Sequence, residues 1–312
     1  MRTAFINKLT ELAEKDRRIM LLVGDLGFGV VVDFAKRLPD QFINIGVAEQ
    51  NMAGVATGLA LAGKIVFTYS IANFPILRCL EPIRNDACYH KANVIAVSVG
   101  AGVAYGSLGM THQALEDIAI MRAVPNLSLI APGDPLETAQ AVDYLAQGHG
   151  PAYLRLGRAG EPTVHKNPIS WQFGRAIEVL PGNDLTLIAT GTMLQTAVAA
   201  AEKLQTQNGL SARVLSMHTV KPIDEEAIRK AAAETRRIVT LEEHSVAGGL
   251  GSAVAEVLAE SGINTRFLRI GFPPVFVHEV GNQDYIKKCY GLDVDSVVER
   301  LTGFLRLHAQ ER

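Results

Sequence analysis

The chain has few cysteines, and their arrangement excludes two kinds of site. It contains three in 312 residues, Cys79, Cys88 and Cys289. An odd number of widely spaced cysteines does not fit a disulfide framework, and the spacing is not that of a zinc site. We therefore predict free cysteines that pack inside the fold in a reducing compartment.

Long apolar runs and an excess of charge of one sign are also missing. No stretch approaches the roughly 20 apolar residues of a membrane span, and the start, Met-Arg-Thr-Ala-Phe, is not that of a secretory signal. The net charge of −2 gives no indication of a nucleic acid or a membrane surface as a partner. We therefore expect a cytoplasmic protein that contacts neither nucleic acid nor membrane.

What is present is ordinary for a globular protein. Hydrophobic residues make up 48% of the chain and charged residues 20%, and the sequence shows no internal repeat or low-complexity tract. A chain of 312 residues suits two domains with cores of useful size.

Apolar runs without polar alternation predict strands buried on both faces, as in parallel sheets. Such runs alternate with segments of helical periodicity, which indicates an α/β fold. In the first half we predict strands at 19–23, 42–45, 65–68, 94–99 and 127–131, and helices at 3–14, 52–62, 76–90, 115–121 and 135–147.

A stretch rich in proline and polar residues, 160–168, interrupts this alternation and predicts a linker. The alternation then restarts, with strands predicted at 185–189, 212–216 and 237–241 and helices at 193–205, 223–234 and 249–260. We therefore predict two consecutive α/β domains, 1–165 and 172–312, each with a mostly parallel sheet covered by helices.

The most informative segment is 46–52, Gly-Val-Ala-Glu-Gln-Asn-Met, between a predicted strand and a helix of small residues. It places Glu49 among apolar and small neighbours, where a carboxylate is hard to ionise unless it is hydrogen-bonded. The alternative interpretation is an acid in the first turn of a helix, favoured by the helix dipole.

Two segments carry a resemblance to a known family. The run that begins at residue 44, Asn-Ile-Gly-Val-Ala-Glu-Gln-Asn-Met-Ala-Gly, resembles the segment with the cofactor-activating glutamate of transketolases. Residues 109–113, Gly-Met-Thr-His-Gln, resemble that family's Gly-x-Thr-His-Gln run. The resemblance spans almost the whole chain and implies a pyrimidine-binding domain followed by the small C-terminal domain of transketolases.

The resemblance also implies roles for five residues. It makes Glu49 the group that bonds the aminopyrimidine of thiamine diphosphate, whose thiazolium then acts as electron sink. It assigns His112 to proton transfer and donor binding, Phe74 to stacking on the aminopyrimidine, and Arg158 and Arg2 to a sugar phosphate. Without the resemblance, His112 is a surface or core histidine and Phe74 a core residue.

Other charged residues near these positions have plainer interpretations. We expect Arg78 and Glu81 to lie on a surface or subunit-contact helix, and Arg84 and Asn85 to serve structure or an interface. The acids and histidine at 242–244 lack metal-site spacing. By resemblance they belong to a structural or dimer-contact loop after a strand.

Three positions depart from the family's pattern. Gly29 stands where the family has a serine, Gly100 where it has a histidine, and Ser107-Leu108 where it has an acid that reads a donor hydroxyl. These departures put the ordinary pentose-phosphate substrates in doubt. They favour a modified or non-phosphorylated donor sugar.

The family's diphosphate-binding motif, Gly-Asp-Gly followed by a distant Asn, is missing. The nearest match, Gly-Asp-Leu-Gly at 24–27, predicts turn-forming glycines, with a phosphate cradle as the alternative. No Asp/Asn cluster indicates a magnesium site, so we expect no metal ligands here. A second polypeptide is then expected to hold Mg²⁺ and the diphosphate, while thiamine diphosphate is shared between the two chains.

The resulting hypothesis is one subunit of a split thiamine-diphosphate-dependent transketolase, which transfers a two-carbon ketol unit between sugars or sugar-like substrates. It implies a complementary N-terminal-half subunit, a self-dimer and a heterotetramer. The alternatives are a 2-oxo acid dehydrogenase beta-type subunit, a deoxyxylulose-phosphate synthase, and a non-catalytic scaffold subunit of the same fold.

Overall fold

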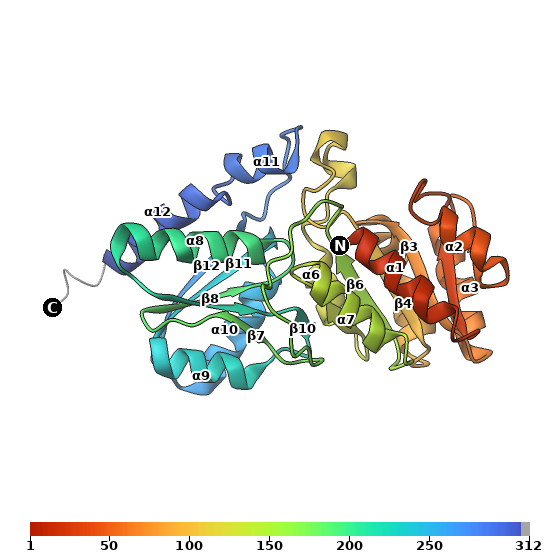
Figure 1. Cartoon of the computed structure of the whole chain (residues 1–312), viewed down its shortest axis with the longest axis horizontal. Helices are drawn as coiled ribbons and strands as arrows, with labels where there is room; N and C mark the ends of the chain where they lie inside the picture. Colours follow the sequence, from red (N-terminus) through yellow and green to blue (C-terminus); the bar gives the residue numbers. More distant parts are fainter. Residues whose placement is uncertain (307–312) are drawn as a thin grey trace.

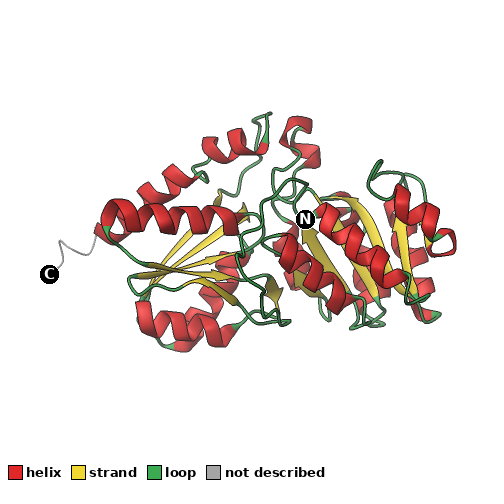
Figure 2. Cartoon of the chain, in the orientation of Figure 1, coloured by secondary structure: helices red, strands yellow, loops and turns green. Residues whose placement is uncertain are grey.

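Two α/β units side by side make up residues 1–306, the part of the chain that this computed structural model describes (Figure 1). Each unit has a central sheet with helices on both faces (Figure 2). The predicted fold class is therefore confirmed.

The first sheet has seven strands in the order β10-β5-β6-β4-β3-β1-β2. Strands β1 to β6 pair in parallel, whereas the edge strand β10 is antiparallel to β5 and comes from the second half of the chain. The strands are β1(Ile19–Val23), β2(Phe42–Asn44), β3(Ile65–Ile71), β4(Val94–Val99), β5(Ser128–Ile130), β6(Ala152–Leu156) and β10(Thr219–Lys221).

Helices cover this sheet on both faces, which explains why its strands lack polar alternation. In β1, Ile19, Leu21 and Val23 pack on one side with α1 and α7, while Met20 and Leu22 pack on the other side with α3. The helices are α1(Arg2–Ala13), α2(Val32–Arg37), α3(Glu49–Leu61), α4(Phe74–Leu77), α5(Leu80–Pro82), α6(Asp117–Ala123) and α7(Pro135–Leu145). Short helical turns are η1(Pro39–Gln41), the π-helical η2(Ile83–Cys88), η3(Gly106–Leu108) and η4(Met110–His112).

The single helix predicted at 76–90 is wrong. The segment from 74 to 88 is broken into α4, α5 and the π-helical turn η2. Pro75 lies in the first turn of α4, where proline is tolerated. Pro82 has no N–H to donate to the carbonyl of Arg78, in the turn that separates α4 from α5.

The second sheet has five strands in the order β12-β11-β8-β9-β7, parallel except for the edge strand β7. They are β7(Ile177–Leu180), β8(Leu185–Ala189), β9(Ala212–Ser216), β11(Arg237–Ser245) and β12(Arg266–Phe272). The helices are α8(Met193–Asn208), α9(Glu225–Thr235), α10(Leu250–Ser261), α11(Gln283–Cys289) and α12(Val294–Arg306).

The predicted linker lies on the surface of the first unit and is held there by polar contacts. The backbone N–H of Val164 donates to Asp134 over 2.9 Å, and His165 Nε2 lies 2.7 Å from Glu137 Oε1. Since β10 also pairs with the first sheet, the two units are fastened at more than one place.

The cysteines are all free, as predicted, but they differ in burial. Cys79 and Cys88 are buried, whereas Cys289 at the end of α11 is exposed, so its prediction as a packing residue is wrong. Across residues 1–306, no helix combines the length and apolar character needed to cross a bilayer.

Candidate functional site

The residues predicted for the site follow the carboxyl ends of parallel strands. Glu49 comes after β2, Phe74 after β3, His112 after β4 and Arg158 after β6. Arg2 begins α1, which leads back toward the start of β1. The carboxyl ends of parallel strands meet at one edge, where α/β proteins bind their ligands. The topology therefore gathers the predicted residues along one edge of the first sheet.

The order of the strands sets the layout of this edge. Strands β2 and β6 lie four positions apart in the sheet, which corresponds to about 19 Å at the usual strand spacing. Glu49 and Arg158 therefore follow strands near opposite ends of the edge, with Phe74 and His112 following the strands between them.

Glu49 is a buried carboxylate with a cation on its open side. It begins α3 and its side chain is 4% exposed. Its Oε2 accepts a hydrogen bond of 3.1 Å from Arg78, whose side chain is 55% exposed. Arg78 is exposed, as expected of a surface residue, and its guanidinium also belongs to the environment of Glu49, which the sequence did not indicate.

Phe74 and His112 continue this cluster. Their rings lie 5.1 Å apart in an edge-to-face arrangement, and the Arg78 guanidinium lies 4.8 Å from the centre of the Phe74 ring. Asn73 donates to the carbonyl of Thr111 over 3.0 Å, which ties together the loops that carry the two rings. Glu49, Arg78, Phe74 and His112 thus form one contiguous group, which we call the Glu49 cluster.

The predicted anion-binding arginines lie away from this cluster. Arg158 is exposed, and its guanidinium lies 5.3 Å from the centre of the Tyr105 ring. Arg2 lies near Tyr69: burial raises the pKa of Tyr69, and the positive charge of Arg2 opposes that rise. Nε of Arg2 is buried, and within the described chain it has no hydrogen-bond partner.

The N-terminal ammonium connects the start of α1, which carries Arg2, with the segment that carries Arg158. Met1 donates to Glu161 over 2.7 Å, and Glu161 follows Arg158 closely in the chain. The start of α1 therefore lies beside the segment that follows β6, which puts Arg2 and Arg158 toward the same end of the edge.

The departures from the family's pattern have structural consequences. Gly100 has a φ of +88°, and a Cβ at this position would overlap the ring of Tyr105. Tyr105 therefore fills the space in which a side chain at position 100 would begin. Gly29 also has a positive φ, +76°, but open space around it, and Leu108 exposes 54% of its surface.

The surroundings of Glu49 fit the pyrimidine end of thiamine diphosphate. A Cβ at Gly24 would lie 3.8 Å from Glu49 Cγ and 4.0 Å from Ser70 Oγ. That hydroxyl is buried without a hydrogen-bond partner in residues 1–306. A carboxylate, an unpaired hydroxyl and the ring of Phe74 are suitable groups for a flat, nitrogen-rich ring.

The turn at 24–27 is the nearest counterpart of a diphosphate motif in residues 1–306. Among the described residues, no three or more His, Cys, Asp or Glu side chains are grouped so as to hold a metal ion. The Gly-Asp-Leu-Gly segment forms a turn: Asp25 and Gly27 have φ of 53° and 88°. The amide group of Asn44 braces the turn, donating to Asp25 Oδ1 over 2.9 Å and accepting from its N–H over 3.1 Å.

The acids and histidine at 242–244 lie within β11, not in a loop after a strand, and all are buried. Burial raises the pKa of Glu242 to about 7, against the opposing effect of two N–H donors from the start of α10. Burial lowers the pKa of His244 to about 4. These residues lie where the two units meet, since the N–H of Ala119 in α6 points at His244 Nε2 over 3.4 Å.

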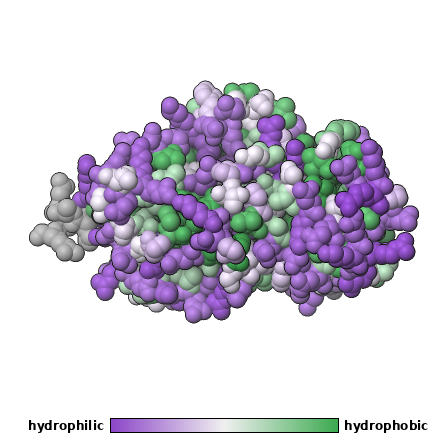
Figure 3. All heavy atoms as spheres, in the orientation of Figure 1, coloured by the Kyte–Doolittle hydropathy of each residue, from purple (hydrophilic) through white to green (hydrophobic). Residues whose placement is uncertain are grey.

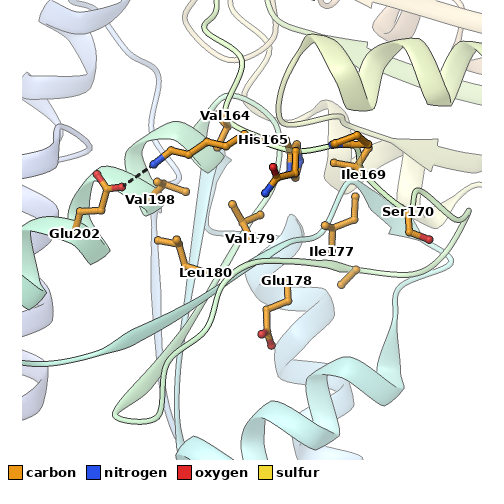
Figure 4. Close-up of a pocket in the computed structure, with 14 residues that line it drawn as sticks. Val164, His165, Ile169, Ser170, Ile177, Glu178, Val179, Leu180, Val198 and Glu202 are labelled. Atoms are coloured by element: carbon orange, nitrogen blue, oxygen red, sulfur yellow. Dashed lines mark ion pairs between the residues drawn. The ribbon is translucent and has the colours of Figure 1, made fainter.

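A cavity of about 480 Å³ lies between the linker and the second unit (Figure 4). Apolar side chains such as Val164, Ile177 and Val198 line it, and Lys166 pairs with Glu202 across 3.9 Å at its rim. It shares no residue with the Glu49 cluster. The cavity is therefore separate from the site predicted at the edge of the first sheet.

Family models identify both halves of the chain. Residues 1–161 match the transketolase pyrimidine-binding domain, and residues 174–297 match the transketolase C-terminal domain. The chain therefore belongs to the transketolase family, as predicted.

Several similar proteins are C-terminal sections or subunits of transketolases. A putative transketolase C-terminal section from Methanocaldococcus jannaschii is 43% identical over 96% of this chain and 95% of its own length. One of the subunits of the apulose-4-phosphate transketolase of Phocaeicola vulgatus is 42% identical over 98% of this chain and 97% of its own. A solved split-gene transketolase, an inactive β4 tetramer, is 40% identical with a TM-score of 0.88 and covers 98% of both chains.

Proposed function

We propose that this chain is the pyrimidine-binding half of a split thiamine-diphosphate-dependent transketolase. It transfers a two-carbon ketol unit between sugars or sugar-like substrates, together with a subunit that holds the diphosphate. The observation that carries this proposal is the Glu49 cluster, a buried carboxylate and an aromatic ring beside a histidine, on the edge where the sheet's strands end.

Glu49 and Phe74 would hold the aminopyrimidine. Glu49 is positioned by the first turn of α3 and shielded from water, so its bond to a ring nitrogen would be little weakened by competing solvent. The ring of Phe74 offers a face for stacking. Thiamine diphosphate, when bound, supplies the electron sink for the transferred carbon unit.

His112 would exchange a proton with a hydroxyl of the sugar. An imidazole suits this task near neutral pH because its ordinary pKa is close to 6.5. Thr111 Oγ1 lies 3.0 Å from Nδ1 of His112, which leaves Nε2 to face a substrate. Arg78 places a guanidinium beside Glu49, to which it donates a hydrogen bond.

A partner subunit would supply Mg²⁺ and the diphosphate site. Apolar side chains around the Glu49 cluster support a covering protein surface: Phe28 is 83% exposed and Val47 75%, and Leu77, Leu108 and Met110 are also exposed. Apolar atoms lie among the hydrophilic ones on the face of the first unit seen in Figure 3. We also expect a self-dimer and a heterotetramer with the partner; the β4 tetramer of the split-gene relative supports the self-association.

The substrate would differ from the ordinary pentose phosphates. Leu108 and Tyr105 give this part of the site a more apolar character than an acid and a histidine would, while Arg158 and Arg2 retain positive charge. The Phocaeicola vulgatus relative belongs to a transketolase for apulose 4-phosphate. A phosphorylated, modified ketose is therefore the first donor class to test, in a cytoplasmic pathway.

The test is a reconstitution. The chain alone, the complementary subunit alone and their mixture would be assayed for ketol transfer with thiamine diphosphate and Mg²⁺. We expect activity only when the two subunits are mixed. Full activity of this chain by itself would refute the split-enzyme proposal, and a correctly assembled but inactive mixture over a panel of ketoses would favour a scaffold role.

A further inference from the structure

The loop that carries His112 is anchored in the second unit. It leaves the first sheet after Val99 and returns to it at α6, and its two stems pair through a bridge between Gly102 and Ala114. In Figure 1 the yellow part of the chain that contains this loop rises beside α11. The backbone N–H of Gly281, just before α11, donates to Gly106 O over 3.4 Å.

Apolar side chains at both stems reinforce this anchoring. Val103 and Leu115 are buried and belong to the hydrophobic core of the second unit, alongside Leu187, Leu241 and Phe272. The N–H of Ser245 in β11 also donates to Leu115 O over 2.8 Å. The geometry of the His112 loop therefore depends on the second unit as well as on the first sheet.

One side chain joins these parts directly. Glu243 of β11 is 1% exposed, and its Oε1 accepts from the backbone N–H of Val103 over 2.8 Å. Its Oε2 accepts from Thr192 Oγ1 over 2.6 Å, and Gln283 Nε2 donates to both oxygens over 2.9 and 2.8 Å. The carboxylate is thus fixed by groups at the start of α8 and α11 and holds the loop at its first stem.

Gly102 allows this close approach. Its φ is +63°, and a Cβ there would overlap the carboxylate of Glu243. Glycine meets both demands, because it takes a positive φ without strain and leaves the space empty. The contact between the loop and β11 therefore depends on Gly102 as well as on Glu243.

We propose that Glu243 is a positioning residue for the transketolase reaction: by holding Val103 and Gly102, it fixes the loop that presents His112 to the site. The second unit then contributes to catalysis without touching the cofactor or the reacting atoms. This inference rests on the proposed function, because its kinetic effect is on ketol transfer.

The first test measures the loop without any activity assay. Backbone hydrogen exchange of the isolated chain would be compared for wild type, Glu243→Gln and Gly102→Ala. We expect the Val103 and Ala114 amides to exchange about tenfold or more faster in both variants, since local opening sets these rates, while amides in β8 stay unchanged. Unchanged exchange in the loop of both variants would overturn the proposal.

Matched controls separate this effect from general destabilisation. Gly63→Ala introduces a side chain at a φ of +91° in open space, so it carries the backbone cost of Gly102→Ala without the contact. Thr192→Val removes one donor to Glu243 and leaves Oε1 on the loop. Both controls should leave exchange at Val103 near wild type; an equal increase in Gly63→Ala would overturn the proposal.

The second test asks whether Glu243 acts through His112. In the assembled enzyme we expect Glu243→Gln to lower kcat about 10- to 100-fold, the effect of a lost charge-assisted hydrogen bond, with thiamine diphosphate affinity within about twofold of wild type. In a His112→Ala background the same change should have little further effect, because coupled residues are not additive. A full additional loss there would overturn the proposal. An inactive wild-type assembly would count against the proposed function, while hydrogen exchange would still test whether Glu243 holds the His112 loop.

Discussion

Two arginine–carboxylate pairs in this chain have the same chemistry and opposite surroundings. In the first, Arg78 pairs with Glu49 at 3.1 Å, with side-chain exposures of 55% and 4%. In the second, Arg155 of β6 pairs with Asp117 of α6 at 2.6 Å, and both side chains are 1% exposed. One pair opens onto the edge of the sheet, and the other is sealed where the two units meet.

The sealed pair makes several further hydrogen bonds. Asp117 also accepts from Tyr153 Oη over 2.5 Å, and Arg155 Nη2 donates to the carbonyls of Ala114 and Glu243 over 2.9 and 3.0 Å. Burial raises the pKa of a carboxyl, but Arg155 and its other partners outweigh that effect and keep the pKa of Asp117 below its usual value. These bonds satisfy both carboxylate oxygens of Asp117 and engage Nε and Nη2 of Arg155, and both side chains are closed to solvent, so this pair stabilises the fold.

The open pair leaves capacity unused. Glu49 receives one hydrogen bond, and the neighbouring Ser70 hydroxyl has no partner within residues 1–306. The Arg78 guanidinium lies over the Phe74 ring. Incomplete satisfaction of buried polar groups is costly in a purely structural role. Burial of a carboxylate alone therefore does not identify a functional residue. Neighbouring polar groups without hydrogen-bond partners, at an open edge of the sheet, are the better indication.

The largest expected effect concerns the open pair. Glu49→Gln in the assembled enzyme should lower kcat by roughly 10²–10⁴-fold, because the amide cannot exchange a proton with the aminopyrimidine as a carboxylic acid does. Urea unfolding of the isolated chain should change little. Near-wild-type turnover would show that Glu49 has no part in the mechanism. The open pair would then differ from the sealed pair in exposure alone.

The sealed pair should respond in the opposite way. Asp117→Asn leaves the Arg155 charge buried without a counter-charge, which costs about 3–5 kcal/mol of stability. Urea unfolding of the isolated chain measures this cost directly. If Asp117→Asn proved no more destabilising than Glu49→Gln, the structural assignment of this pair would be wrong.

An intermediate effect is expected at the other end of the site. Arg158→Ala should raise KM for phosphorylated ketoses by about 10- to 150-fold, the equivalent of 1.5–3 kcal/mol for one charge-assisted hydrogen bond. Free ketoses should be affected little, and Arg158→Lys should restore part of the phosphate preference. Equal changes for phosphorylated and free sugars would show that Arg158 does not bind a phosphate.

A smaller effect separates the two arginines. Arg78→Gln should change the free energy of unfolding by no more than about 1 kcal/mol, because half-exposed ion pairs contribute little. Arg155→Gln, its sealed counterpart, should cost several times more. Comparable losses from the two substitutions, measured under the same urea conditions, would contradict the distinction between open and sealed pairs.

The smallest effect involves a third pair, His165 and Glu137, which holds the linker against the first unit. Burial lowers the pKa of His165, but the Glu137 carboxylate outweighs it and raises that pKa above 6.5. The pair's contribution is therefore complete below pH 6.5 and is lost as pH rises through the raised pKa. Stability measured from pH 5 to 9 should show this fall in wild type and lack it in His165→Gln, whereas replacing the exposed His90 should leave it in place.

Much of the fold could be predicted because its signals are local. The strands at 19–23, 94–99, 185–189 and 212–216 agree with β1, β4, β8 and β9 residue for residue, since continuous apolar runs define parallel strands well. The helix at 76–90 failed because Pro82 and the π-helical turn interrupt a regular pattern.

Site residues could be predicted where they belong to a sequence motif. Residues that join the site only through contacts in the folded chain could not. Glu49 and His112 were predicted from two short segments and Phe74 from the family's stacking position, and the three lie together in the structure. Arg78 was assigned to a surface helix, because its sequence neighbours say nothing of Glu49. The role proposed for Glu243 depends on the junction between two distant segments, 102–103 and 243, which no local pattern reveals.

The proposed division of the cofactor site between two chains can be measured by calorimetric titration of thiamine diphosphate in the presence of Mg²⁺. This chain, the complementary subunit and their mixture would be titrated separately. We expect tight binding in the mixture and at least about 100-fold weaker binding to either chain alone, with assembly favoured by the cofactor. Equal affinity of this chain alone and of the mixture would contradict it.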